Sequence, residues 1–60
     1  MHTGQVVWAN TGGADVLALF VKAGDDKDTI QMPDGSHAQL AYREPEDRDT
    51  GGSGLTFWKV

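Results

Sequence analysis

Residues 28–42 read DTIQMPDGSHAQLAY, and this stretch decides the fold. Polar and apolar residues alternate on both sides of Asp34-Gly35, and that arrangement is the strongest short-range signal for a β-hairpin in the chain. In an extended strand, alternate side chains point to the same face of the sheet. The alternation therefore predicts a buried face made of Ile30, Met32, Ala38, Leu40 and Tyr42, and an outward face made of Thr29, Gln31, His37 and Gln39.

The run before this hairpin, Ala14 to Lys22, is apolar on both faces of the predicted strand. A helix is the alternative, because alanine and leucine are good helix formers and Asp15 could cap one. The short length and the flanking glycines favour a strand. Its two faces carry Leu17, Leu19 and Val21 on one side and Val16, Ala18 and Phe20 on the other. Both faces need a cover, and in one small sheet the simplest cover for the second face is another subunit.

Two further strand-like runs lie near the ends of the chain, and each contains a tryptophan. Gln5 to Ala9 holds Trp8, and Leu55 to Val60 holds Trp58. Terminal residues usually fray, so two tryptophans there indicate that both end strands belong to the sheet. Gly12-Gly13 permits a tight reversal after the first strand. The five runs predict a single all-β domain over residues 1–60, folded as a five-stranded small barrel.

The stretch from Arg43 to Gly54 is polar and ends glycine-rich, so a mobile polar loop is predicted at about 43–54.

The composition of the chain limits the kinds of partner that it can bind. The chain has 60 residues, no cysteine and a formal net charge of −4, which disfavours direct binding of nucleic acid or of an anionic membrane. No run reaches the roughly 18 apolar residues that a membrane helix needs, and no leader pattern follows Met1. These features predict a cytoplasmic chain whose partner is a protein.

The sequence offers little for catalysis or metal binding. Nucleophilic catalysis needs a base beside the nucleophile, but Ser36 and His37 are adjacent in a strand and point to opposite faces. His2 lies at the terminus. The acidic residues at 25, 26 and 28 and those at 44, 46, 47 and 49 do not have the spacing of a calcium loop. We expect neither enzyme activity nor a cofactor nor a metal site.

Aromatic residues mark the predicted contact surface. Phe57 and Trp58 are adjacent, so they cannot both point into the core, and we expect one of them to be exposed or to lie at an interface. Trp58 either covers an open end of the barrel or forms a stacking or peptide-binding platform. The candidate binding residues are Trp58, Phe57, Arg43, Glu44, Glu46, Asp47 and Asp49.

The order of strands resembles a small SH3-like barrel. The opening Gly4-Gln5-Val6-Val7-Trp8-Ala9 is similar to the Gly-x-Val-Val-Trp-Ala start of chromatin-type barrel modules, over about six residues. The aromatic cage of those modules cannot be assembled from matching positions, so no functional residue is carried over. The closing Gly52-Ser53-Gly54-Leu55-Thr56-Phe57-Trp58 resembles the ends of short uncharacterised phage and actinobacterial proteins.

Three functions are compatible with these patterns. The first is a non-catalytic protein-binding module that can self-associate as a homo-oligomer. The second is a small acidic inhibitor that presents the 44–49 acids to a basic surface of a host enzyme, a contact that high salt would weaken. The third is a structural subunit of a larger assembly such as a phage particle.

Overall fold

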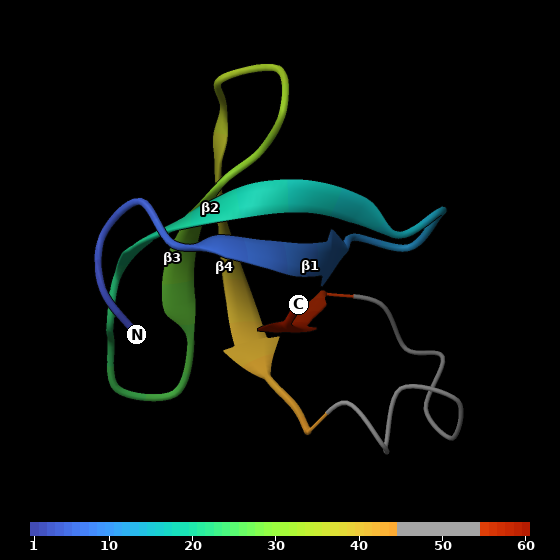
Figure 1. The fold of residues 1–60 in the computed structure, drawn as a ribbon. Helices are drawn as coiled ribbons and strands as arrows, with labels where there is room; N and C mark the ends of the chain where they lie inside the picture. Colours follow the sequence, from blue (N-terminus) through green and yellow to red (C-terminus); the bar gives the residue numbers. More distant parts are fainter. Residues whose placement is uncertain (45–54) are drawn as a thin grey trace.

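The computed structural model describes residues 1–44 and 55–60 (Figure 1). Its five strands are β1 (Val6–Asn10), β2 (Val16–Lys22), β3 (Asp28–Gln31), β4 (His37–Tyr42) and β5 (Thr56–Lys59). They close into one barrel in the order β1-β2-β3-β4-β5. The described residues contain no helix, and hence none that is long and apolar enough to cross a membrane. The predicted all-β fold with five strands in a small barrel is confirmed.

The two ends of the chain meet in the sheet. β1 pairs with β5 in antiparallel register over four residues, and this register places Trp8 opposite Trp58. The barrel closes where β4 runs parallel to β5, through the pairs Ala41↔Thr56 and Tyr42↔Phe57. Figure 1 shows β5 directly beneath β1. The prediction that both terminal strands belong to the sheet is confirmed, and the predicted mobile loop falls largely on residues 45–54, which lie outside the described residues.

β2 is a strand, as its flanking glycines indicate. The turn that precedes it is held by Asn10, whose Oδ1 accepts a hydrogen bond from the Gly12 N–H at 2.8 Å. The Asn10 Nδ2 donates to the Gly13 carbonyl and to Asp15 Oδ1, both at 2.8 Å. Gly12 has a φ of 112°, a conformation that favours glycine. The chain therefore reverses within five residues and lays β2 antiparallel along β1.

The central hairpin forms where the sequence predicts it. β3 and β4 pair through Ile30↔Ala38 and Gln31↔His37. The turn is closed by the Gly35 N–H donating to the Met32 carbonyl at 2.9 Å and the Met32 N–H donating to the Ser36 carbonyl at 2.7 Å. Gly35 has a φ of 92°, and it occupies the Gly position of the Asp-Gly signal.

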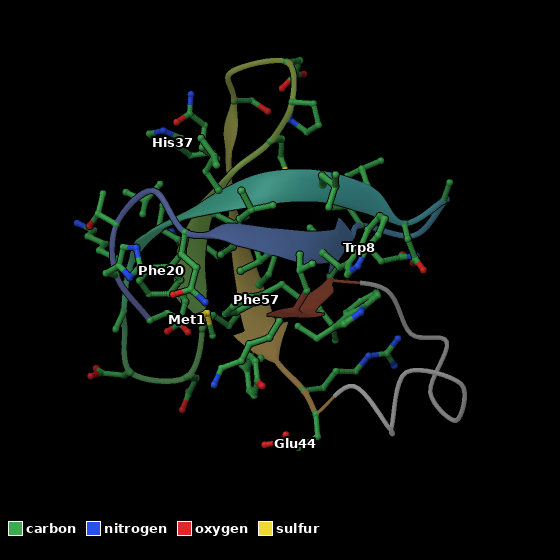
Figure 2. All side chains as sticks on the ribbon, viewed as in Figure 1. Met1, Trp8, Phe20, His37, Glu44 and Phe57 are labelled. Atoms are coloured by element: carbon green, nitrogen blue, oxygen red, sulfur yellow. The ribbon has the colours of Figure 1, made fainter. Side chains whose placement is uncertain are left out.

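Every strand contributes to one hydrophobic core, which contains Val7, Ala9, Ala18, Phe20, Ile30, Leu40 and Phe57. Phe57 lies at its centre, with ring centroids 6.1 Å from Phe20 and 5.4 Å from Tyr42, the latter in an edge-to-face arrangement. Figure 2 shows Phe20 and Phe57 inside the barrel and His37 outside it. Ile30 and Leu40 are fully buried, as the alternation predicts, and Met32, Ala38 and Tyr42 pack against the core.

Thr29 departs from the predicted pattern. The sequence places it on the outward face, but its side chain is buried. Gln39, its partner across β3 and β4, donates a hydrogen bond from Nε2 to the Thr29 hydroxyl at 2.8 Å. The Gln39 side chain thus covers the Thr29 hydroxyl, and Thr29 is buried although it lies on the outer face of the sheet.

Candidate functional site

The structure places Phe57 and Trp58 on opposite sides of β5, and both side chains are buried. Phe57 lies in the core, while Trp58 is only 1% exposed although it does not belong to the core cluster. The expectation that one of them is exposed is therefore wrong, and the alternative that one of them lies at an interface stays a prediction. Trp58 is shielded on the outer side of the barrel, where the Arg43 guanidinium carbon lies 4.9 Å from the centroid of its ring system.

Arg43 and Trp58 come together because β4 and β5 are neighbours. The Arg43 N–H donates to the Phe57 carbonyl at 3.0 Å, which extends the β4–β5 pairing by one residue. The Arg43 side chain then lies over the indole, in the geometry of a cation–π contact. The Trp58 Nε1–H is buried and has no hydrogen-bond partner among the residues that the structure describes. Within the described chain, the Arg43 guanidinium therefore covers one face of the Trp58 ring on the outer side of β5.

The acidic candidates are placed only in part. Glu44 is exposed at the end of the described segment, away from the barrel (Figure 2). Glu46, Asp47 and Asp49 lie outside the described residues. The acidic-inhibitor hypothesis thus stays a prediction, and no geometry of this structure adds to it.

The exposed apolar residues lie on another part of the barrel. Val6, Leu17 and Leu19 are 48%, 50% and 39% exposed, and we call these three the apolar face. The β1–β2 register places Val6 opposite Leu19 and Trp8 opposite Leu17. The apolar side chains on the outer side of β1 and β2 are therefore cross-strand neighbours and not scattered single residues.

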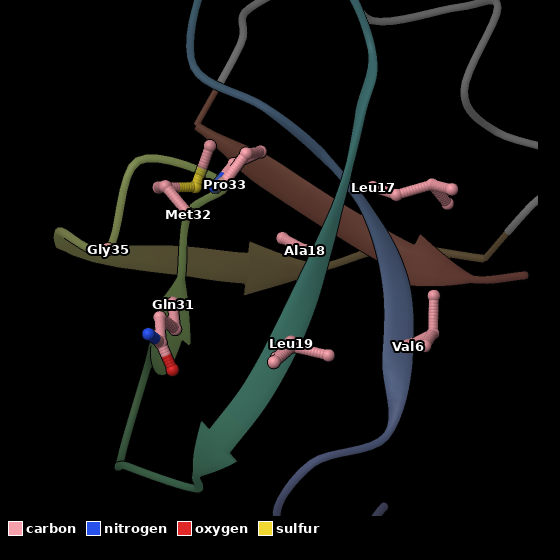
Figure 3. Close-up of a pocket in the computed structure, with 8 residues that line it drawn as sticks. All are labelled: Val6, Leu17, Ala18, Leu19, Gln31, Met32, Pro33 and Gly35. Carbon is pink, nitrogen blue, oxygen red and sulfur yellow. The ribbon is translucent and has the colours of Figure 1, made fainter.

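A cleft of about 320 Å³ adjoins the apolar face (Figure 3). It lies between β2 and the residues that follow β3, and its walls include Leu17, Leu19, Met32 and Pro33. All eight residues that line it are uncharged. We call it the first cleft.

A second cleft, of about 520 Å³, lies on the other side of the same gap. It shares Met32 and Pro33 with the first cleft and adds Val16 and Ala38. Its one charged lining residue is Asp34. The Asp34 Oδ1 accepts hydrogen bonds from the Ser36 hydroxyl at 2.7 Å and from the Ser36 N–H at 2.9 Å. These two bonds lower the pKa of the Asp34 carboxyl, so the second cleft carries a negative charge at neutral pH.

Two polar side chains of the described chain serve its turns. The Ser36 hydroxyl donates to Asp34, so it is engaged in the turn. Asp28 Oδ1 accepts from the Gly24 N–H at 3.0 Å in the β2–β3 connection. Over residues 1–44 and 55–60, no group of three or more histidine, cysteine or acidic side chains is close enough to hold a metal ion.

Comparison of the chain with known protein families, with curated proteins and with solved structures finds no match. The resemblances to chromatin-type barrel modules and to short phage and actinobacterial proteins stay predictions.

Sequence reasoning found one half of this surface and missed the other. The apolar character of both faces of Ala14 to Lys22 points directly to Leu17 and Leu19. Met32 and Pro33 were not included among the candidate binding residues, because a Pro-Asp-Gly-Ser turn reads only as a turn. The available signal was the proline at the end of β3, since a residue without an N–H stops the pairing of a neighbouring strand.

Proposed function

We propose that the domain is a non-catalytic protein-binding module and that the apolar face, with the first cleft beside it, is its contact surface. The observation that carries this proposal is the grouping of three half-exposed aliphatic side chains beside an uncharged cleft. An aliphatic patch that adjoins a cleft marks an interaction site more often than single exposed residues do.

The charge distribution supports a contact of this kind. The chain has a net charge of −4, whereas no residue of the described part of the chain that lines the first cleft is charged. A partner can cover this area without burying an unpaired charge, which would cost several kcal/mol. Burying each half-exposed aliphatic side chain contributes on the order of 1 kcal/mol, since full burial of such a side chain contributes about 1.5–3 kcal/mol. The apolar face thus supplies enough apolar area for a specific but weak contact.

A matched pair of substitutions tests the proposal. Leu17 and Leu55 are both 50% exposed, but only Leu17 lines the first cleft. We expect Leu17→Gln to weaken partner binding by about tenfold, since the lost burial and the added polar group together amount to roughly 1.4 kcal/mol. Leu55→Gln should leave binding unchanged.

The measurement is capture of proteins from a lysate of the source organism on the tagged wild-type chain and on both variants, at low and at high salt. Proteins retained by the wild type and by Leu55→Gln, but lost with Leu17→Gln, support the proposal when they persist at high salt. The same set retained on all three chains would contradict it. Proteins released from the wild type by salt alone would favour the acidic-inhibitor hypothesis instead.

A further inference from the structure

One edge of β2 is left open inside a barrel that is otherwise closed. On the side of β1, the residues of β2 from Val16 to Leu19 are all paired. On the side of β3, pairing begins only at Leu19, which lies opposite Gln31. Within the described chain, the segment Val16–Ala18 is therefore paired along one side, and we call its other side the open edge.

The backbone of Leu17 points toward this open edge. The Phe20 N–H donates to the Gln5 carbonyl at 2.9 Å, and the Phe20 carbonyl accepts from the Gly4 N–H at 2.8 Å. Both groups of Phe20 thus face the side of β1. Because the direction of backbone groups alternates along a strand, those of Ala18 also face β1, and those of Leu17 face the opposite side. The N–H and C=O of Leu17 therefore face the gap between β2 and the β3–β4 turn.

The sequence explains why β3 does not close this gap. Continuing the register Leu19↔Gln31 would place Pro33 opposite Leu17. Proline has no N–H to donate, so it ends the pairing. Met32 already uses both of its backbone groups within the turn. Figure 1 shows the β3–β4 turn extending past β2, and Figure 3 shows Met32 and Pro33 across the gap from it.

Both clefts flank this edge. A strand added beside β2 would direct alternate side chains to the two faces of the sheet. One set would meet Leu17 and Leu19 at the first cleft, and the other would meet Val16 and Ala38 at the second. Asp34 lies at the second cleft only.

We propose that the open edge binds an extended segment of a partner protein by strand addition. This inference rests on the function proposed above and names the form of its partner. The segment pairs its backbone with Leu17 and places apolar side chains at alternate positions against the first cleft. On its other face it carries lysine or arginine, which complements Asp34 and the net charge of −4. A second copy of the chain is the poorer occupant, because it would bring two acidic domains and two Asp34 turns together.

The test uses the full chain labelled with ¹⁵N and ¹³C, together with a synthetic nonapeptide in which valine alternates with lysine or threonine. Addition of this peptide should shift the Leu17 amide resonance and slow its hydrogen exchange about 2- to 12-fold, which corresponds to one hydrogen bond worth 0.5–1.5 kcal/mol. The Ala18 amide, which faces β1, is the internal control and should keep its exchange rate. A peptide with glutamate in place of lysine should bind more weakly.

Two N-methylated peptides make the result specific to backbone pairing. An added strand uses the amides along one of its edges only. Methylation of one alternate set of amides should therefore abolish binding, and methylation of the other set should not. Strand addition is wrong if both methylated peptides bind equally well, or if both fail to bind.

The outcomes separate this inference from the proposed function. Peptide-induced shifts confined to the methyl groups of Val6 and Leu19, with no change at the Leu17 amide, would overturn strand addition and leave the apolar face as a binding surface. Absence of any shift at millimolar peptide would also overturn it, while the capture experiment would still decide the proposed function. Self-association of the chain that competes with the peptide would show that a second copy, and not a partner segment, occupies the open edge.

Discussion

Two outward surfaces of this barrel both carry large apolar side chains, but those of one surface are covered and those of the other are exposed. Where β1 meets β5, the outward Trp58 is covered and only 1% exposed, with Arg43 over its ring. Where β2 meets β3, the outward Leu17 is half exposed beside a cleft. The first seam is paired over four residues, whereas pairing at the second stops at Leu19. Completed pairing, together with a long cationic side chain, closes one seam, whereas a proline leaves the other open.

The substitution with the largest expected effect disrupts the hydrophobic core behind both seams. Phe57→Ala should destabilise the domain by about 3–5 kcal/mol, because it removes a fully buried ring that packs on Phe20 and Tyr42. A domain of this size has roughly 3–5 kcal/mol of stability, so the variant should be largely unfolded at 25 °C. Urea unfolding followed by circular dichroism measures this, with Leu17→Ala as the exposed control. A folded Phe57→Ala variant would contradict the placement of Phe57 in the core.

The substitution with the next largest expected effect uncovers Trp58 at the closed seam. Arg43→Ala should destabilise the domain by about 1 kcal/mol, because it removes the guanidinium from the face of the Trp58 ring. Urea unfolding gives the energy, and quenching of tryptophan fluorescence by acrylamide reports the exposure of the ring. Lys59→Ala, at an exposed position of β5, serves as the control. Unchanged quenching in Arg43→Ala would show that Arg43 does not cover Trp58.

A third substitution would close the open seam. Pro33→Val supplies an N–H that can donate to the Leu17 carbonyl, which allows β3 to extend and the Leu17 N–H to donate to the carbonyl of residue 33. The Leu17 amide should then exchange about 2- to 12-fold more slowly, as expected for one added hydrogen bond of 0.5–1.5 kcal/mol, and peptide binding at the open edge should be lost. Asp34→Asn, which changes the same turn and leaves Pro33 in place, is the control for the Leu17 exchange rate in the free chain. Retained peptide binding in Pro33→Val would show that the edge is not the site.

The strand pattern could be predicted from the sequence for a physical reason. Alternation in residues 28–42 and the Asp-Gly turn encode the hairpin locally, and the apolar run at 14–22 needs only its neighbouring glycines to be assigned as a strand. The burial of Trp58, in contrast, involves Arg43, which the barrel brings across from the end of β4. No local pattern predicts that a cation covers an outward tryptophan. The open edge likewise depends on the register between β2 and β3, which places Pro33 opposite Leu17.

The smallest effect concerns the turn beside the open seam. Since the hydrogen bonds from Ser36 lower the pKa of Asp34 in the folded chain, its ionised form stabilises the turn above the ordinary pKa of 3.8. That contribution is lost as the pH falls below 3.8 and through the lowered value. The Tm difference between the wild type and Asp34→Asn should therefore be constant near neutral pH and shrink in acid. A difference that does not change with pH would show that the carboxylate charge contributes nothing there.

Amide hydrogen exchange in the free chain tests whether β2 has an unpaired edge at Leu17, as it has within the described residues. Leu17 and Ala18 are neighbours in one strand, but the Ala18 N–H faces β1 and the Leu17 N–H faces the gap. We expect fast exchange at Leu17 and slow exchange at Ala18, since an unpaired amide is not protected by a strand hydrogen bond. Equal protection of the two amides would contradict the open edge and the strand addition built on it.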